Sequence, residues 1–516
     1  MPRECRDRKT QHISTFNNQQ TFETSEKEEV QYTEDVHQAS KITTTDDTEK
    51  AGGDLSVRSF EGTPEERAYV RKLNYFIMPL VGGIIFVQFC DKAALSVAPV
   101  LGLNADLQLT GTQFSVLGSM FYLGHLIYQI PNQFILQRVP HAKYLSVLLL
   151  FWGVVMALTG ACQTFGQVAA MRFLLGLFEA AAMPTLYMIT ATLYRRTEQP
   201  VLFGYITLCN GVGAAIGASI SYGFAHMNNA RGIENWRWGH ICFGSLTVAL
   251  GVVSWFCLVD KPDHPLLRLT ETEKQIAKDR TRDNAVVKNK IFKYDQMWEA
   301  VKEPRYWYIM IGGLCISLQN GGMLVFSTTF VLGLGFTGEQ SLLLQIPSGM
   351  ASALGVFIAV LLAQKTKQML YSSMFMLSIG IIGLIILLAI PDGAIKLLGF
   401  YLSWAGTGSY ALVVTIIGNN VKGYTKKIFY NSSIMIAYTV GNFCGPLMMA
   451  DVQAPRYLGG VGGFLGGFAV AFICVYLVRV QGARVNNQRL ANKSGEETDV
   501  YLDLTDKEDK NFIYRL

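Results

Sequence analysis

Residues 369–390 read MLYSSMFMLSIGIIGLIILLAI, a run of 22 residues without Asp, Glu, Lys or Arg. A helix needs about 20 consecutive apolar residues to cross the roughly 30 Å hydrocarbon core of a bilayer. Comparable segments lie at approximately 73–96, 113–135, 144–163, 167–193, 200–223, 238–259, 306–332, 340–363, 394–418, 429–450 and 459–480. The pattern predicts an all-α integral membrane protein with twelve transmembrane helices.

The charged residues are few and unevenly placed. Of 516 residues, 50% are hydrophobic and only 16% are charged, whereas a soluble chain carries about a quarter. Most charges fall in residues 1–70, 260–305 and 482–516, so the composition excludes a soluble enzyme and a disordered scaffold. Residues 1–70 hold 15 acidic and 9 basic side chains, and the remaining basic residues lie between apolar segments. Membrane orientation accounts for these basic residues better than nucleic-acid binding does.

The loops between segments predict the orientation. Basic residues of the short loops on the proposed inner side are Arg138, Lys143, Arg195, Arg196, Lys365, Lys367, Lys422, Lys426 and Lys427. Those on the proposed outer side are Arg231, Arg237, Lys396 and Arg456. Because Lys and Arg concentrate on the cytoplasmic side of membrane proteins, we expect both termini to be cytosolic.

The polar segment 260–305 divides the spans six and six. We expect a disordered cytosolic tail at 1–70, a six-helix half at 71–259, a cytosolic linker loop at 260–305, a second half at 306–481 and a cytosolic tail at 482–516. Basic loops at corresponding positions of the two halves indicate that the halves are related. Two parallel six-helix halves with a binding site between them form the major facilitator fold.

Four ionisable residues lie inside the first half: Asp91, Lys92, Arg172 and Glu179. Such residues are costly in a bilayer unless they face water or a partner, so each is a functional candidate. Adjacent helical residues diverge by about 100°, so Asp91 and Lys92 cannot face the same wall. Arg172 and Glu179 lie two turns apart on one face. We expect Lys92 and Arg172 to bind an anionic substrate and Asp91 and Glu179 to carry a proton. Alternatively, the four charges only pair with one another and brace the two spans.

The second half contains amides and phenols inside its spans and almost no charge. Such residues often only form hydrogen bonds between helices. Their concentration nevertheless predicts neutral substrate recognition by this half, with Asn320 and Tyr410 as binding candidates.

The sequence contains no nucleotide-binding phosphate loop and no metal-site motif, and we expect no enzymatic activity, cofactor or metal. His125 is interpreted as the one histidine within a span, and packing is favoured over a proton relay. An ion gradient would then drive uphill transport.

Several short motifs occur together in a specific order: FCDKAALS at 89–96, RFLLGLFEA at 172–180, QNGG at 319–322, GYTKK at 423–427 and QAPRY at 453–457. Residues 68–482 with these motifs resemble the anion:cation symporter family of the major facilitator superfamily, in particular its fungal allantoate permease branch.

The resemblance implies proton-coupled uptake of a small organic anion, such as a ureide, vitamin or carboxylate compound. We expect a monomer in the plasma membrane. It implies that Asp91, Lys92, Arg172 and Glu179 serve substrate binding and proton coupling. The segment 200–223 lacks the Gly-Pro pattern of drug/proton antiporters, which favours symport. Export of a secondary metabolite on the same fold and a transport-inactive nutrient sensor are the alternatives.

Overall fold

The computed structural model describes residues 63–195, 198–227, 229–283, 293–390, 393–491 and 504–516. The chain divides into Met1–Ser59 and Phe60–Leu516, and the described residues all belong to the second unit. Most of the predicted tail 1–70 therefore lies outside the described residues, while its last residues begin the first described helix.

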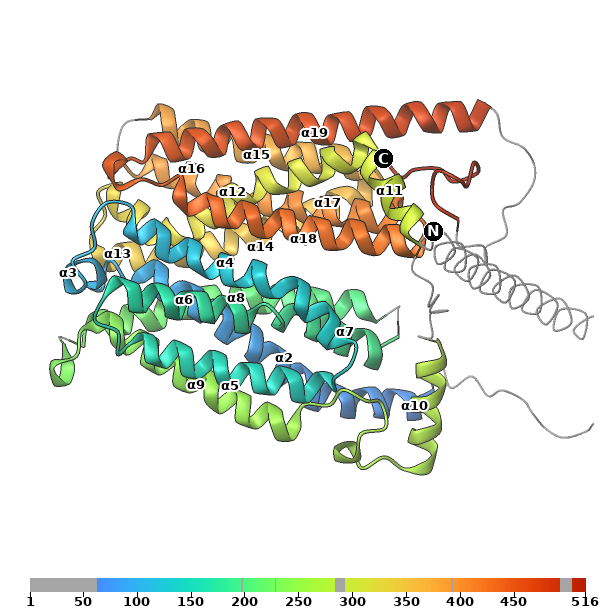
Figure 1. The fold of residues 1–516 in the computed structure, drawn as a ribbon, viewed down its shortest axis with the longest axis horizontal. Helices are drawn as coiled ribbons and strands as arrows, with labels where there is room; N and C mark the ends of the chain where they lie inside the picture. Colours follow the sequence, from blue (N-terminus) through green and yellow to red (C-terminus); the bar gives the residue numbers. More distant parts are fainter. Residues whose placement is uncertain (1–62, 196–197, 228, 284–292, 391–392, 492–503) are drawn as a thin grey trace, which may run out of the picture. The chain divides into compact units, whose positions relative to one another are not determined.

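Every regular element in the described ranges is a helix. In chain order the α-helices are α2 (Pro64–Val97), α3 (Leu103–Asp106), α4 (Gln113–Leu136), α5 (His141–Thr159), α6 (Phe165–Glu179), α7 (Ala182–Leu193), α8 (Gln199–Ala225), α9 (Asn235–Cys257), α10 (Glu271–Asp283), α11 (Tyr294–Lys302), α12 (Pro304–Gly333), α13 (Gly338–Leu343), α14 (Gln345–Thr366), α15 (Met369–Ala389), α16 (Ile395–Ser403), α17 (Gly406–Asn420), α18 (Tyr424–Leu447) and α19 (Leu458–Ala491). Figure 1 shows the long helices side by side, with α3 and α13 at one end and α10, α11 and the C-terminus at the other.

The helices agree with the twelve predicted segments. Among the residues described, nine helical spans are both long and apolar enough to cross a membrane. The remaining three, α4, α8 and α18, contain 24, 27 and 24 residues, which corresponds to about 36–40 Å at 1.5 Å per residue. We call α2–α9 the first half and α12–α19 the second half. The predicted all-α architecture is confirmed for the described residues.

Local sequence explains where the first span begins. The Thr63 side chain accepts a hydrogen bond from the backbone N–H of Glu66, and Pro64 occupies the first helical position. Both are typical of a helix N-terminus, because a side-chain oxygen satisfies a free N–H and proline has none to satisfy. Glu65 and Glu66 place negative charge at the positive end of the helix dipole.

Close approach of α4 and α6 depends on a pair of glycines. A Cβ at Gly124 would overlap the carbonyl oxygen of Phe173, and a Cβ at Gly176 would overlap that of Phe121. The two backbones therefore pack against each other with no room for a side chain. This contact fixes the position of Glu179, which ends α6 one turn after Gly176.

The fourth and tenth spans are both interrupted. Helix α6 ends at Glu179 and α7 starts at Ala182, while α16 ends at Ser403 and α17 starts at Gly406. The residues at the two breaks, Ala180, Ala181, Trp404 and Ala405, keep right-handed helical backbone angles, so each span continues across its break. Trp404, in the second interruption, lines the cavity described below.

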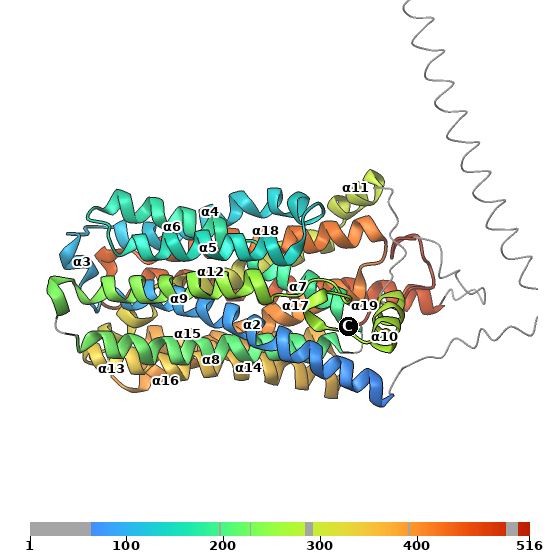
Figure 2. The same ribbon diagram turned by 90° about the horizontal axis from the view of Figure 1, so that it is seen from below.

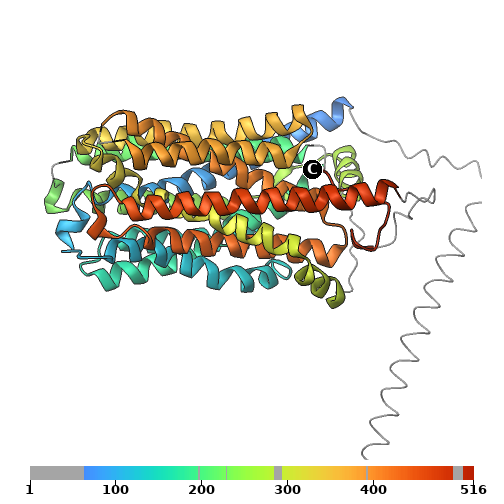
Figure 3. The same cartoon turned by 90° about the horizontal axis from the view of Figure 1, so that it is seen from above.

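The linker and the C-terminal segment contain more structure than the predicted polar loop and tail. Residues 260–305 include α10 and α11, which lie at the same end of the bundle (Figure 2). Helix α10 packs against α2 and α7, whereas α11 packs against α18 and α12. Helix α19 continues beyond the predicted span to Ala491 (the red helix in Figure 3). Each linker helix thus belongs to a different half.

Candidate functional site

A cavity of about 310 Å³ lies between the two halves, within the range of small-molecule sites. Its walls come from α2, α4 and α8 of the first half and α12, α14, α17 and α18 of the second. Of the described residues that line it, Lys92 is the one with a Lys, Arg, Asp or Glu side chain. The other polar lining residues are Ser96, Tyr122, His125, Asn210, Asn320, Ser327, Thr328, Gln345, Ser348, Ser352, Thr407, Tyr438 and Thr439. One positive charge is therefore surrounded by neutral donors and acceptors.

Lys92 connects this cavity to a buried carboxylate. Its Nζ lies 3.1 Å from Oε1 of Glu179, whose side chain is 1% exposed, while the Lys92 side chain is 22% exposed. Gln88, one turn before Lys92 on α2, donates a hydrogen bond of 2.8 Å to the same Oε1. Within the described part of the chain, Oε2 of Glu179 has no hydrogen-bond partner. The carboxylate can therefore accept a proton on Oε2 without losing an existing hydrogen bond.

Asp91 lies behind the cavity wall. The helical turn from Lys92 directs its side chain toward α5, where Nε1 of Trp152 donates a hydrogen bond to Oδ2. The residue is fully buried, and its Oδ1 has no hydrogen-bond partner among the described residues. Asp91 is thus a buried carboxylate held by a neutral donor.

Arg172 forms its hydrogen bond with His240, which was not predicted as a site residue. Its Nη2 lies 3.0 Å from Nε2 of His240 on α9, and Nδ1 of His240 lies 3.0 Å from the carbonyl oxygen of Trp236. A guanidinium can only donate, so Nε2 accepts and the ring proton is on Nδ1, where it bonds the carbonyl. The interpretation of His125 as the one histidine within a span is wrong, since His240 also lies inside a predicted span.

Asn320 and Tyr410 occupy different layers of the second half. Asn320 lines the cavity and accepts a 3.4 Å hydrogen bond from the hydroxyl of Tyr438. Tyr410 packs behind Tyr438, with ring centroids 5.0 Å apart. Tyr410 is therefore one layer away from the space that Asn320 faces.

Several hydrogen bonds between the halves lie toward the end of the bundle that carries α3 and α13, and a further one, from Thr439 to Gln129, lies deeper along α4. Ser96 Oγ, near the end of α2, is 2.7 Å from Ser327 Oγ and 3.2 Å from Thr328 Oγ1 on α12. Ser115 and Ser119 on α4 donate to the carbonyl oxygens of Met449 and Phe443, respectively. These contacts hold the halves together at the end opposite α10 and α11.

The predicted site residues thus fall into two groups. Lys92 and Asn320 line the cavity, whereas Asp91, Arg172, Glu179 and Tyr410 are not among its lining residues. The ion pair between Lys92 and Glu179 does join the first and fourth spans, as the bracing alternative expects. It also leaves Lys92 in contact with the cavity, so bracing and binding are compatible.

Three neighbours of these residues were not predicted: Gln88, Trp152 and His240. Gln88 lies four residues before Lys92, so the sequence could have predicted that both side chains share one face of the helix. A polar side chain in an apolar segment was a comparable signal for His240. A tryptophan in an apolar span is ordinary, and nothing in the sequence connects Trp152 with Asp91.

In the described ranges, no group of three or more His, Cys, Asp or Glu residues could hold a metal ion. The cavity lining itself offers one imidazole, His125, and no carboxylate. Binding through an ammonium group and neutral hydrogen bonds is the chemistry that its described residues can supply.

Comparisons of sequence identify relatives of this chain. The model of the Major Facilitator Superfamily matches residues 80–446. The allantoate permease of Saccharomyces cerevisiae is 31% identical over 481 residues, which cover 89% of this chain and 88% of the permease. The uncharacterized transporter C417.10 of Schizosaccharomyces pombe is also 31% identical, over 90% of this chain and 92% of the relative. The predicted resemblance is confirmed.

Solved structures with low identity share the fold. A bacterial homologue of the human lysosomal transporter Spinster, in an inward-facing and occupied conformation, has a TM-score of 0.63 at 14% identity and covers 81% of this chain and 98% of its own. A D-xylose-proton symporter has a TM-score of 0.58 at 15% identity, covering 80% of this chain and 97% of its own. The family match over most of the membrane region and the relatives of near-equal length lead to one conclusion: this chain is a membrane transporter that belongs to the Major Facilitator Superfamily.

Proposed function

We propose that this transporter is a proton-coupled symporter that takes up a small organic anion across the plasma membrane, with both termini in the cytosol. The ion pair between Lys92 and Glu179 carries the proposal, because it joins a cation that lines the cavity to a buried carboxylate. A substrate carboxylate and Glu179 compete for the same ammonium group. Protonation of Glu179 removes its negative charge and frees Lys92 for the substrate.

This competition links the two ligands thermodynamically. If a proton on Glu179 strengthens anion binding at Lys92, a bound anion must strengthen protonation of Glu179 by the same factor. The loaded transporter then carries anion and proton together, and the halves rock to expose the cavity to the other side. Release of the proton restores the ion pair and expels the anion.

The other charged residues have supporting roles in the proposal. Arg172 is buried within the first half and adds positive potential near Asp91 and Glu179, while Asp91 is a second carboxyl that can exchange a proton. Asn320 contributes a neutral amide from the second half, and Tyr410 supports the Tyr438 ring. Allantoate and other ureides are the first candidates, because a relative is named for allantoate.

The test is labelled uptake in a host that lacks such transporters, with candidate anions screened at pH 5 and pH 7. We expect faster accumulation at pH 5. Glu179→Gln should abolish accumulation driven by the proton gradient but retain exchange of labelled for unlabelled substrate. Asp263→Asn, at an exposed carboxylate of the linker, is the control. Proton-driven accumulation that survives Glu179→Gln would refute the assignment.

Two other experiments distinguish the proposed symport from the alternatives. A deletion strain that retains a metabolite inside the cell, without any uptake defect, would indicate export. Signalling that persists when flux has been abolished would indicate a sensor.

A further inference from the structure

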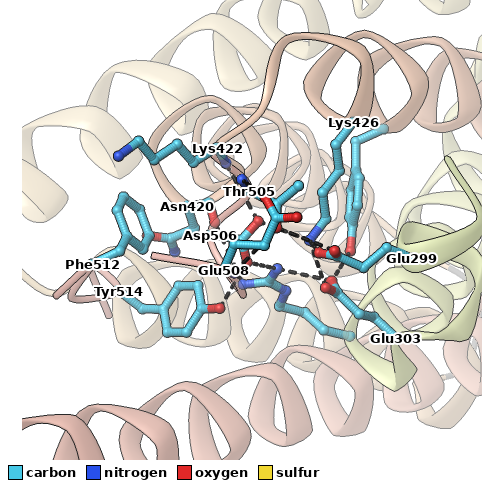
Figure 4. Close-up of polar contacts among 12 residues, drawn as sticks. Glu299, Glu303, Asn420, Lys422, Lys426, Thr505, Asp506, Glu508, Phe512 and Tyr514 are labelled. Carbon is cyan, nitrogen blue, oxygen red and sulfur yellow. Dashed lines mark hydrogen bonds and ion pairs between the residues drawn. The ribbon is translucent and has the colours of Figure 1, made fainter. Parts of the chain in front are cut away.

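The last residues of the chain, 504–516, fold back onto the end of the second half that carries α11. Asp506 is fully buried there, with Oδ2 2.6 Å from Arg305 Nη2 and Oδ1 2.9 Å from Lys426 Nζ. The hydroxyl of Tyr514 donates a 2.7 Å hydrogen bond to Asp506 Oδ2. Figure 4 shows Asp506 in the middle of these groups, with Glu299 and Glu303 on one side and Tyr514 on the other. A carboxylate from the C-terminal segment is thus seated between two cations of the helical bundle.

Two asparagines of the bundle hold the backbone of the segment. Asn420 accepts from the N–H of Arg515 and donates to its carbonyl oxygen, both at 2.8 Å. Asn486 does the same with Tyr514, at 2.9 and 2.8 Å. A carboxamide that pairs with both backbone groups of one residue reproduces the hydrogen-bond pattern of a neighbouring strand. This is a binding arrangement for an extended peptide.

Further contacts connect the segment to other helices. The backbone N–H of Met369, at the start of α15, donates to the carbonyl oxygen of Leu516 at 2.9 Å. Arg489 on α19 donates to the carbonyl oxygens of Phe512 and Asp506. Thr505 Oγ1 donates to Glu299 on α11 at 3.2 Å. The segment therefore touches the linker helix as well as several helices of the second half.

The charged groups of the bundle at this site balance one another when the segment is absent. Lys426 Nζ lies 2.7 Å from Glu299 and 2.5 Å from Glu303, and Arg305 lies 3.0 Å from Glu303. Two cations and two carboxylates remain paired there after Asp506 has left. Lys422, which loses its 2.6 Å ion pair with Asp509, is 31% exposed and can be hydrated. A buried charge without a partner would forbid release, and this arrangement avoids it.

We propose that the end of the second half is a binding site for the chain's own C-terminal peptide, LTDKEDKNFIYRL at 504–516, which acts as a releasable strap. When bound, the strap fastens α11 to the second half, so that this part of the linker and the helix ends move as one body. The contacts that define the site are the Arg305 and Lys426 pair for Asp506 and the two asparagines for the backbone. The proposal does not depend on the substrate or on proton coupling.

Hydrogen–deuterium exchange of the full-length protein in detergent tests the strap. Asp506→Asn should increase exchange about tenfold or more in residues 504–516 and in α11, because charge-assisted hydrogen bonds to Arg305 and Lys426 are lost. Lys507→Gln changes the exposed neighbouring residue and should leave both segments as in the wild type. Wild-type protection of both segments in Asp506→Asn would overturn the proposal.

Two further measurements keep the test decisive if Asp506→Asn folds poorly. Arg489→Gln removes donors to the strap backbone but leaves the charge cluster intact, and it should also accelerate exchange in 504–516. An excess of the synthetic peptide 504–516 should displace the native strap and accelerate its exchange, whereas the peptide with Asn in place of Asp506 should not. If neither Arg489→Gln nor the wild-type peptide has an effect, the segment is a fixed part of the fold and the strap is refuted.

Discussion

The ammonium group of Lys92 lies 3.1 Å from the carboxylate of Glu179, but only the lysine side chain reaches the cavity. One partner of the ion pair can be hydrated from the cavity, whereas the other is enclosed by protein. The pair is therefore asymmetric: loss of either residue removes the same contact but leaves a different group behind.

This asymmetry predicts unequal effects on stability. Lys92→Gln leaves the Glu179 carboxylate buried without its cation and should lower the free energy of unfolding by about 1–3 kcal/mol. Glu179→Gln should cost less, because Lys92 stays partly hydrated. Thermal unfolding in detergent measures both, with the double variant Lys92→Gln/Glu179→Gln expected to be more stable than Lys92→Gln. Equal losses for the single variants would contradict the asymmetry.

The hydrogen bond from Arg172 to His240 predicts a difference between two substitutions. His240→Phe removes the acceptor and leaves a buried guanidinium N–H unpaired, at a cost of about 1–3 kcal/mol. His240→Gln retains a carbonyl oxygen that can accept from Arg172 and should lose less stability. The comparison is made by the same unfolding measurement, and a Gln variant as unstable as the Phe variant would exclude this role.

The contact between α4 and α6 predicts that Gly176→Ala is destabilising. The added methyl group would overlap the carbonyl oxygen of Phe121, so the helices must separate, at a cost of about 1–3 kcal/mol. Gly166→Ala is the matched control in the same helix, since no heavy atom lies within 4 Å of a Cβ there. We expect this control to unfold at the wild-type temperature or above. A tolerated Gly176→Ala would show that the helices are less closely packed.

The contact of Ser96 with Ser327 predicts a reversible lock. Their hydroxyl oxygens are 2.7 Å apart, and the residues belong to different halves. A Ser96→Cys/Ser327→Cys variant should form a disulfide under oxidation that holds this end closed, because rocking of the halves requires it to open. Uptake should then stop after oxidation and return after reduction, while uptake by each single variant should not respond to oxidation or reduction. Uninhibited uptake by the cross-linked protein would rule out opening at this contact.

The strap predicts a pH dependence that differs from that of proton-coupled uptake. Burial alone would raise the pKa of Asp506, but Arg305 and Lys426 outweigh it and hold this pKa below its ordinary value. A lowered carboxyl pKa stabilises the folded state above the unfolded value of about 3.9, and the contribution is lost as the pH falls below that value. Protection factors of residues 504–516 should therefore be the same at pH 7 and pH 5. Release of the strap between these two values would contradict the assignment of Asp506.

Several features follow from sequence alone because they depend on local composition and periodicity. Apolar runs such as 369–390 are long enough to cross a bilayer wherever they lie in the fold, and the helices agree with the twelve predicted segments. The one-turn relation of Gln88 to Lys92 and the divergence of Asp91 from Lys92 are likewise properties of a single helix. The short motifs were sufficient to indicate the family.

Contacts between distant segments were decided only by the tertiary structure. Helix α6 brings Glu179 to Lys92, α9 brings His240 to Arg172, and α5 brings Trp152 to Asp91. No local pattern specifies these pairings, because they depend on how the helices pack. Asp506 is the clearest case: in the sequence it belongs to a polar tail, and only the fold places it between Arg305 and Lys426. Sequence determined which side chains are costly to bury, and packing determined which partners stabilise them.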